Sequence, residues 1–206
     1  MLNPSGNGKK PLKYSSVAIS SPPGAGRSTL LNNLKNYLTP LGWEFFSGGD
    51  WSRQFSIAAG KQDPNDLKHH KATDYGDEVD HQIDRAMREK ITDSSVHMAI
   101  ESWIAGWNAR DIKHVLKVLL MCDEALRIDR IVNRDNIAVG EAKKHIRERE
   151  TANLAKWKRM YGVRDFWDPK YYDLVINTYS HGPRETLDLV LQALGYFHAN
   201  GQQAVV

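Results

Sequence analysis

The segment from residue 16 to residue 38 limits the possible folds more than any other part of the sequence. Its first residues, Ser16–Ser20, form an apolar run with the length of a buried strand, which ends in the turn-rich stretch SPPGAGRST. Apolar residues then recur on one helical face, at Leu30, Leu31, Leu34, Tyr37 and Leu38. The pattern predicts a strand, a glycine loop and an amphipathic helix in direct succession.

Strands and helices are predicted to alternate along the rest of the chain. Short apolar runs predict four more strands, at residues 43–46, 96–100, 115–121 and 172–176, the first of them closed by the stretch Ser-Gly-Gly-Asp at residues 47–50. Amphipathic stripes predict helices over residues 77–90 and after Gly182. This alternation indicates an α/β fold with a mostly parallel sheet that helices cover on both faces.

Residues 135–160 interrupt the alternation with a long, highly charged helical pattern that has few apolar anchors. Such a segment predicts a mobile lid. Residues 1–13 are expected to be a flexible lead-in and residues 199–206 a tail, which leaves one domain over residues 14–198.

Composition excludes several classes of protein. The chain has 206 residues, and its 28 Lys and Arg against 25 Asp and Glu give a net charge of +3, too small and too dispersed to indicate a nucleic-acid partner. Cys122 is the single cysteine, which excludes an intramolecular disulfide and fits a reducing, cytoplasmic setting. No run approaches the ~18 apolar residues of a membrane span.

The stretch SPPGAGRS nearly spells the phosphate-binding motif GxxxxGK[ST]. Gly24 and Gly26 would let backbone N–H groups turn toward phosphate oxygens, and the following helix would direct the positive end of its dipole at them. Ser28 would then ligate Mg²⁺. The predicted ATP-binding residues are Ser21, Pro22, Pro23, Gly24, Ala25, Gly26, Arg27, Ser28 and Thr29.

Two positions depart from that motif. Arg27 replaces the lysine, which keeps the positive charge but presents a larger, planar group. Ser21 replaces the first glycine, so the turn must form without glycine's freedom at positive φ. An ordinary loop between a strand and a helix, and a loop that binds phosphate without catalysis, both stay open as interpretations.

The succession of SPPGAGRST, GGDWSRQF, DHQIDRAMRE, ESWIAGW and YDLVINT resembles the cytidylate kinases, above all their short archaeal-type branch, over about residues 15–197. The resemblance implies a three-layer P-loop nucleoside monophosphate kinase fold with a five-stranded parallel sheet and a helical lid at about residues 134–160. A monophosphate-binding segment is expected at about residues 50–92. The implied reaction is transfer of the γ-phosphoryl group of ATP to CMP or dCMP, with Mg²⁺.

The resemblance also implies acceptor-binding residues. Asp50 and Arg53 of GGDWSRQF match the aspartate and arginine of the monophosphate site, and an arginine one helical turn past a strand end can grip a phosphate with two hydrogen bonds. Asp84 lies in the segment that resembles the next substrate-facing helix. A solvated surface is the alternative for these charged residues.

Glu101 follows the predicted strand 96–100, where its carboxylate could hold Mg²⁺ through water or orient the acceptor. The family usually has Gly-Arg after this glutamate, and the arginine contacts the substrate phosphate. Here the pair is Ser-Trp, so Trp103 together with Trp107 could form a stacking wall. Packing of both tryptophans in the core is the alternative.

Arginines flank the predicted lid. Arg130 and Arg134 fit the family's lid-flanking arginines. Arg149, Asn153 and Lys156 match a stripe that is Arg, Asp, Arg in cytidylate kinases, where it touches the ribose, the phosphate or the transferring group. A solvated charged face would look the same. The expected catalytic residues are Arg27, Arg130, Arg134 and Arg149, with Asn153 binding the substrate.

Three functions remain open from the sequence: a nucleoside monophosphate kinase for CMP or dCMP, a non-catalytic nucleotide-binding protein, and a P-loop kinase for another small acceptor. All three have small molecules as partners, with no nucleic acid and no membrane. A monomer is expected, with a dimer open.

Overall fold

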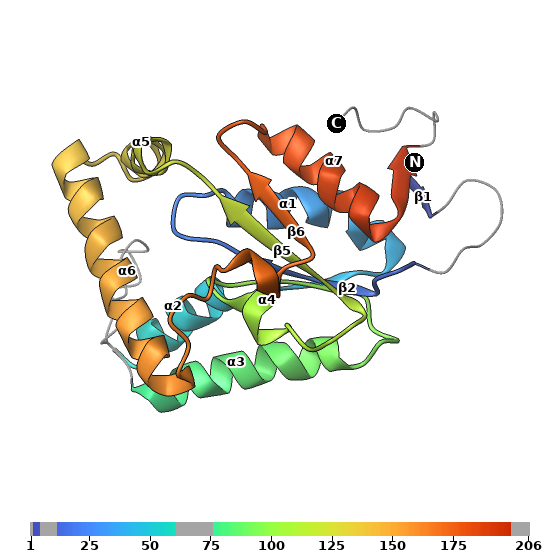
Figure 1. Ribbon diagram of the computed structural model, residues 1–206, viewed down its shortest axis with the longest axis horizontal. Coiled ribbons are helices and arrows are strands. Elements are labelled where there is room, and N and C mark those ends of the chain that lie inside the picture. Colours follow the sequence, from blue (N-terminus) through green and yellow to red (C-terminus); the bar gives the residue numbers. More distant parts are fainter. Residues whose placement is uncertain (1, 5–11, 61–75, 199–206) are drawn as a thin grey trace.

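A computed structural model describes residues 2–4, 12–60 and 76–198 (Figure 1). Its main sheet has five parallel strands in the order β3-β4-β2-β5-β6. The strands are β2 (Ser16–Ser20), β3 (Glu44–Ser47), β4 (Met98–Glu101), β5 (Val115–Met121) and β6 (Leu174–Asn177). The predicted sheet is confirmed, and β2 and β5 have the predicted bounds because both are continuous apolar runs buried on both faces.

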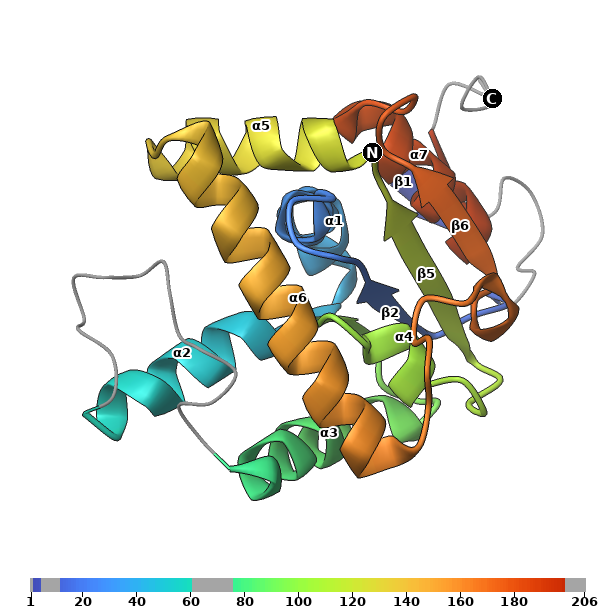
Figure 2. The ribbon, with the colours of Figure 1, turned by 60° about the vertical axis from the view of Figure 1, so that its left-hand side comes forward.

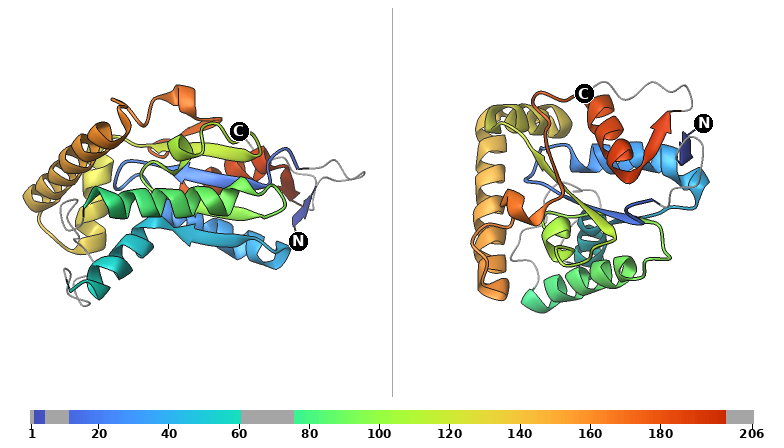
Figure 3. Two further views of the ribbon diagram at one scale, coloured as in Figure 1. Left: turned by 90° about the horizontal axis from the view of Figure 1, so that it is seen from below. Right: turned by 45° about the vertical axis from the view of Figure 1, so that its right-hand side comes forward.

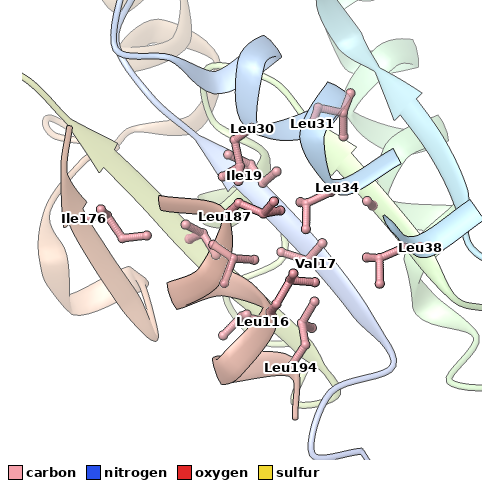
Figure 4. Packing of buried hydrophobic residues seen from close by; sticks show 14 of the residues in the cluster. Val17, Ile19, Leu30, Leu31, Leu34, Leu38, Leu116, Ile176, Leu187 and Leu194 are labelled. Carbon is pink, nitrogen blue, oxygen red and sulfur yellow. The ribbon is translucent and has the colours of Figure 1, made fainter. Parts of the chain in front are cut away.

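Helices cover both faces of this sheet. On one face α1 (Arg27–Leu38) and α7 (Pro183–Leu194) pack their leucines on β2 and β5, as Figure 4 shows. On the other face lie α2 (Gly48–Ala58), α3 (Asp77–Thr92) and the short α4 (Ala105–Asn108). Two 3₁₀ turns, η1 (Thr39–Leu41) and η2 (Pro169–Tyr171), precede β3 and β6. The three-layer arrangement is the one that the sequence pattern predicts.

The predicted lid segment is helical. Most of it lies in the long α6 (Val139–Tyr161), and the preceding α5 (Glu124–Asp135) overlaps it only at its last two residues. The two helices share a small apolar cluster of their own. Figure 2 shows α6 running from α5 toward α3. No described helix is both long enough and apolar enough to cross a membrane.

A second, two-stranded sheet was not predicted. Strand β1 (Leu2–Pro4) pairs antiparallel with β7 (Tyr196–His198), so part of the expected flexible lead-in forms a strand. Both views of Figure 3 place this pair at the end of the molecule opposite to α6. The expected tail at residues 199–206 lies outside the described residues.

The stretch Ser-Gly-Gly-Asp at residues 47–50 ends β3 and begins α2, whose first residue is Gly48. Ser47 is the N-cap of this helix, and its Oγ accepts a hydrogen bond from the backbone N–H of Asp50 at 3.1 Å. A serine side chain that satisfies one of the first helical N–H groups is a strong start signal. The pair of glycines therefore lies in the first turn of a helix that follows the strand directly.

Gly106 of α4 lies against the ring of Tyr172, and a Cβ at this position would lie 2.9 Å from Tyr172 Cδ1. The ring is anchored by its hydroxyl, which donates to the carbonyl oxygen of Phe166 at 2.7 Å. We therefore expect Gly106→Ala to lower the free energy of unfolding by about 1–3 kcal/mol, as overpacked cores do. Denaturant unfolding measures it, and Gly140→Ala, with open space around its Cβ, is the control. Equal stability of both variants would contradict the prediction.

Candidate active site

A cavity of about 510 Å³ opens at the carboxyl ends of the strands, between the loop before α1 and helices α2, α3 and α6. Residues directly after β2 and β6, and the last residues of β3 and β4, line it. Ala25 is the one predicted ATP-binding residue that does not line it, because its side chain is buried in the core. The cavity brings together Ser21, Pro22, Pro23, Gly24, Gly26, Arg27, Ser28, Thr29, Asp50, Arg53, Asp84, Glu101, Trp103, Arg130, Arg134, Arg149 and Asn153.

The glycine loop has the backbone that a phosphate cradle requires. Gly24 and Gly26 have φ of 78° and 98°, values that favour glycine. A Cβ on Gly24 would also lie 2.8 Å from the carbonyl oxygen of Arg127 in α5. Helix α1 begins at Arg27, so its first N–H groups point toward the cavity edge where the loop ends.

Arg27 is held by protein groups on two sides. Its Nε donates to a carboxylate oxygen of Glu101, and its Nη1 donates to the backbone oxygen of Ser21 at 2.9 Å. The side chains of Arg27 and Glu101 are 13% and 2% exposed, so this ion pair is largely desolvated. The guanidinium therefore links the glycine loop to the end of β4. A lysine, with a single side-chain nitrogen, could not make both contacts in the same way.

Glu101 in turn contacts the start of α2. Its second carboxylate oxygen accepts a hydrogen bond from the hydroxyl of Ser47, the N-cap of that helix. Arg53, one turn into α2, pairs with Asp50 at 2.8 Å. The same guanidinium has a buried Nε without a hydrogen bond to any described residue.

Two of the three arginines of α5, Arg130 and Arg134, differ in their surroundings. Arg130 joins the glycine loop to the end of β6. Its guanidinium donates to the carbonyl oxygen of Gly24 at 3.2 Å and to the backbone oxygen of Thr178 at 2.8 Å. Arg134 pairs with the neighbouring Asp135 at 2.8 Å and is mostly exposed. Arg130 is therefore a fixed cation beside the loop, while Arg134 lies at the rim.

Ion pairs and a hydrogen bond join helix α6 to α3. Asp77, Asp80 and Asp84 of α3 are paired with Arg159, Lys156 and Tyr161 of α6, respectively. A further ion pair of 2.6 Å joins Arg127 of α5 to Glu150 of α6. Lys156, which the sequence places on a substrate-facing stripe, is thus buried against Asp80. Any opening of α6 away from α3 would have to break these bonds.

The carboxyl group of Asp84 is a much weaker acid than an ordinary aspartate. Burial raises the pKa of its carboxyl group from 3.8 to about 7, although the hydroxyl of Tyr161 donates to it at 2.5 Å. Burial likewise raises the pKa of Asp80, against the opposing effect of Lys156. Near neutral pH the wall formed by α3 is therefore less negative than its sequence suggests.

The raised pKa of Asp84 predicts a pH-dependent stability. Between about pH 4 and 7 the folded protein keeps the proton that the unfolded chain releases, so the free energy of unfolding should fall as pH rises through this window. Asp84→Asn removes this contribution, worth up to a few kcal/mol at about 1.4 kcal/mol per pKa unit. Thermal unfolding of both proteins from pH 5 to 8 should show that the stability of the variant, relative to that of the wild type, increases as pH rises. A constant difference across this range would refute the assignment.

Aromatic side chains form the wall between β4 and α6. Trp103 contacts Trp157 edge-on and stacks on Trp167, whose indole N–H donates to the backbone oxygen of Trp103 at 2.9 Å. The guanidinium of Arg149 lies 5.5 Å from the Trp103 ring centre. Trp107 is 5% exposed and belongs to the apolar cluster beneath, so for this residue the core alternative is confirmed.

Several lining residues were missed from the sequence. Ser47 could have been found from the pattern Ser-x-x-Asp, which marks a helix start. Thr178 follows the last strand of the sheet, where ligand contacts are expected. Ile83, Met87 and Trp157 line the cavity but carry no signal that separates them from core residues.

The residues present fit a magnesium ion that arrives with a nucleotide. Ser28 supplies an exposed hydroxyl at the second position of α1, whereas the described residues contain no group of three or more acids, histidines or cysteines that could cage a metal alone. Mg²⁺ typically keeps several waters and takes few protein ligands beside phosphate oxygens. Both Glu101 oxygens accept hydrogen bonds from the protein, so its role as a water-mediated ligand stays a prediction.

Comparisons with known proteins agree with this geometry. The model of the cytidylate kinase-like family matches residues 51–180. Cytidylate kinase of Haloarcula marismortui is 31% identical over 187 residues, which cover 91% of this chain and 93% of that protein. Cytidylate kinase of Thermococcus sibiricus is 30% identical over 188 residues, 90% of either chain. A gluconokinase structure from Sinorhizobium meliloti shares the fold at a TM-score of 0.55 and 11% identity, over 90% of this chain and 93% of its own. The chain therefore belongs to the cytidylate kinase-like family.

Proposed function

We propose that this protein is an ATP-dependent nucleoside monophosphate kinase that phosphorylates CMP or dCMP. The observation that carries the proposal is a single cavity lined both by the glycine loop and by residues of α2, α3 and α6. A donor phosphate on the loop and an acceptor phosphate beside α2 would lie next to one another there, which is what in-line transfer requires. The relatives named cytidylate kinase support CMP as the acceptor.

On the donor side, the backbone N–H groups around Gly24 and Gly26 and the start of α1 would bind the β- and γ-phosphates of ATP. Arg130, fixed against the loop by its bond to the Gly24 carbonyl, would neutralise charge on the same phosphates. Ser28 would hold Mg²⁺, which when bound would neutralise the charge that develops on the phosphate oxygens.

On the acceptor side, Arg53 would bind the phosphate of CMP, because its guanidinium lines the cavity and keeps hydrogen-bonding capacity. Asp84, Trp103 and Asn153 would contact the nucleoside. Arg149 and Arg134 reach the cavity from α6 and the end of α5, between the two halves of the site.

The reaction needs positioning and charge neutralisation more than covalent help from the protein. An oxygen of the acceptor phosphate attacks the γ-phosphorus of ATP, and the bond from that phosphorus to the β,γ-bridging oxygen breaks. ADP leaves, and the acceptor becomes a diphosphate. Arginines around the transferring group would stabilise its three equatorial oxygens.

A coupled assay of ADP release tests the proposal directly. The panel should contain CMP, dCMP, UMP, AMP and GMP together with small hydroxylated acids and sugars as non-nucleotide acceptors. We expect the highest kcat/KM with CMP or dCMP. ATP binding without ADP release on any acceptor would favour the non-catalytic alternative, and turnover confined to a non-nucleotide would favour a kinase for another small molecule.

A further inference from the structure

The ion pair between Arg27 and Glu101 lies between the two halves of the cavity. Arg27 is the first residue of α1 on the donor side, whereas Glu101 ends β4 and contacts the N-cap Ser47 of the acceptor-side helix α2. The Oε1 atom of Glu101 is 3.8 Å from the point where a Cβ on Gly49 would lie. A carboxylate therefore stands at the positive end of the α2 dipole, in the first turn of the helix that carries Arg53.

At this position the charge of the Glu101 carboxylate would weaken the binding of an anionic acceptor. The first N–H groups of α2 and the guanidinium of Arg53 attract a phosphate, and an uncompensated charge on Glu101 would repel it. Glu101 is 2% exposed, so water screens that repulsion poorly. Its compensating cation among the described residues is Arg27.

Arg27 also keeps N–H groups that could donate hydrogen bonds to the phosphates of ATP. Its Nε and Nη1 are used by Glu101 and Ser21, whereas its Nη2 makes no hydrogen bond to a described residue. The side chain lines the cavity. A guanidinium group is planar and has five N–H donors that point along different edges. The same group can therefore bind Glu101 along one edge and a phosphate of ATP along another.

We propose that Arg27 serves the acceptor site as well as the donor site: as the counter-ion of Glu101 it lets an anionic acceptor bind at the start of α2. The inference deepens the proposed function and rests on it. It gives Arg27 a second task besides contact with the donor, and it makes Glu101 a charge to be neutralised, instead of a ligand of the acceptor.

Direct binding of CMP in the absence of ATP tests the inference, by titration calorimetry on the full chain. Arg27→Met should weaken CMP binding by about tenfold or more, since it leaves Glu101 without its cation. The double variant Arg27→Met/Glu101→Gln should recover CMP affinity to within a few-fold of wild type. Binding of a non-hydrolysable ATP analogue should be weakened in both, because the second substitution does not restore a donor-side guanidinium.

Single variants keep the test decisive if Arg27→Met does not fold. Glu101→Gln should bind CMP as tightly as the wild type or more tightly, and Arg27→Lys, which keeps the charge, should lose less affinity than Arg27→Met. Glu44→Gln on β3, with an exposed side chain, is the matched control. Weaker CMP binding by Glu101→Gln, or no recovery in the double variant, would overturn the inference. Absence of CMP binding by the wild type would overturn the proposed function itself, and with it this inference.

Discussion

Replacing Arg149 with glutamine should lower kcat by about 100-fold or more and leave the KM for ATP nearly unchanged. The guanidinium of Arg149 reaches the cavity from α6 and is oriented over the ring of Trp103. A shorter, neutral amide cannot offset the charge that develops on the transferring phosphoryl group. Steady-state kinetics with CMP at varied ATP, together with binding of an ATP analogue, measure the two effects separately.

Arg147→Gln is the matched control, because Arg147 lies on the same helix with an exposed side chain and does not line the cavity. Its kinetics should equal those of the wild type. Equal losses of turnover and of ATP affinity in Arg149→Gln would show that the residue binds the donor instead of acting during transfer.

Replacing Gly24 with alanine should weaken ATP binding by about 100-fold. The added Cβ would lie 2.8 Å from the backbone oxygen of Arg127, and the residue would have to keep a φ of 78°. An L side chain is strained in that conformation. Relief of either conflict would move the loop, and with it the N–H groups that would bind phosphate. Calorimetric titration with an ATP analogue measures the loss.

Gly182→Ala is the control for this substitution. Gly182 has an ordinary φ of −67° before α7, and its Cβ would meet nothing within 4 Å. The variant should bind the analogue normally. Tight binding by Gly24→Ala would mean that the loop does not hold the donor phosphates.

The sheet could be predicted from the sequence because its strands are apolar runs without competing signals. Val115–Met121 is buried over six of its seven positions, and no other element of that length fits such a run. The pair formed by β1 and β7 could not be predicted, since it joins two short segments from opposite ends of the chain. The exact start of α2 could not be predicted, because two glycines usually indicate a turn, whereas here they follow the N-cap Ser47 as the first residues of the helix.

The members of the candidate site could be predicted, but not their partners. Arg27 and Glu101 were each identified, one from a loop motif and the other from a strand end, yet nothing in the sequence joins residues 74 positions apart into an ion pair. The charged stripe on α6 was read as facing the substrate, whereas Lys156 contacts Asp80. Helical spacing fixes which residues share a face, but the neighbour of that face is decided by tertiary packing.

The strand order has a consequence for assembly of the protein on the ribosome. Central strand β2 pairs at Ser16 with Met98 on one side and Val115 on the other. The segment that carries β2, the glycine loop and α1 therefore leaves the ribosome long before its neighbours exist, and only non-local pairing can complete it. Because Arg127 and Thr178 also contact the glycine loop, this loop would be among the last parts to acquire its final shape. Nascent chains that end before α5 should therefore lack affinity for nucleotides.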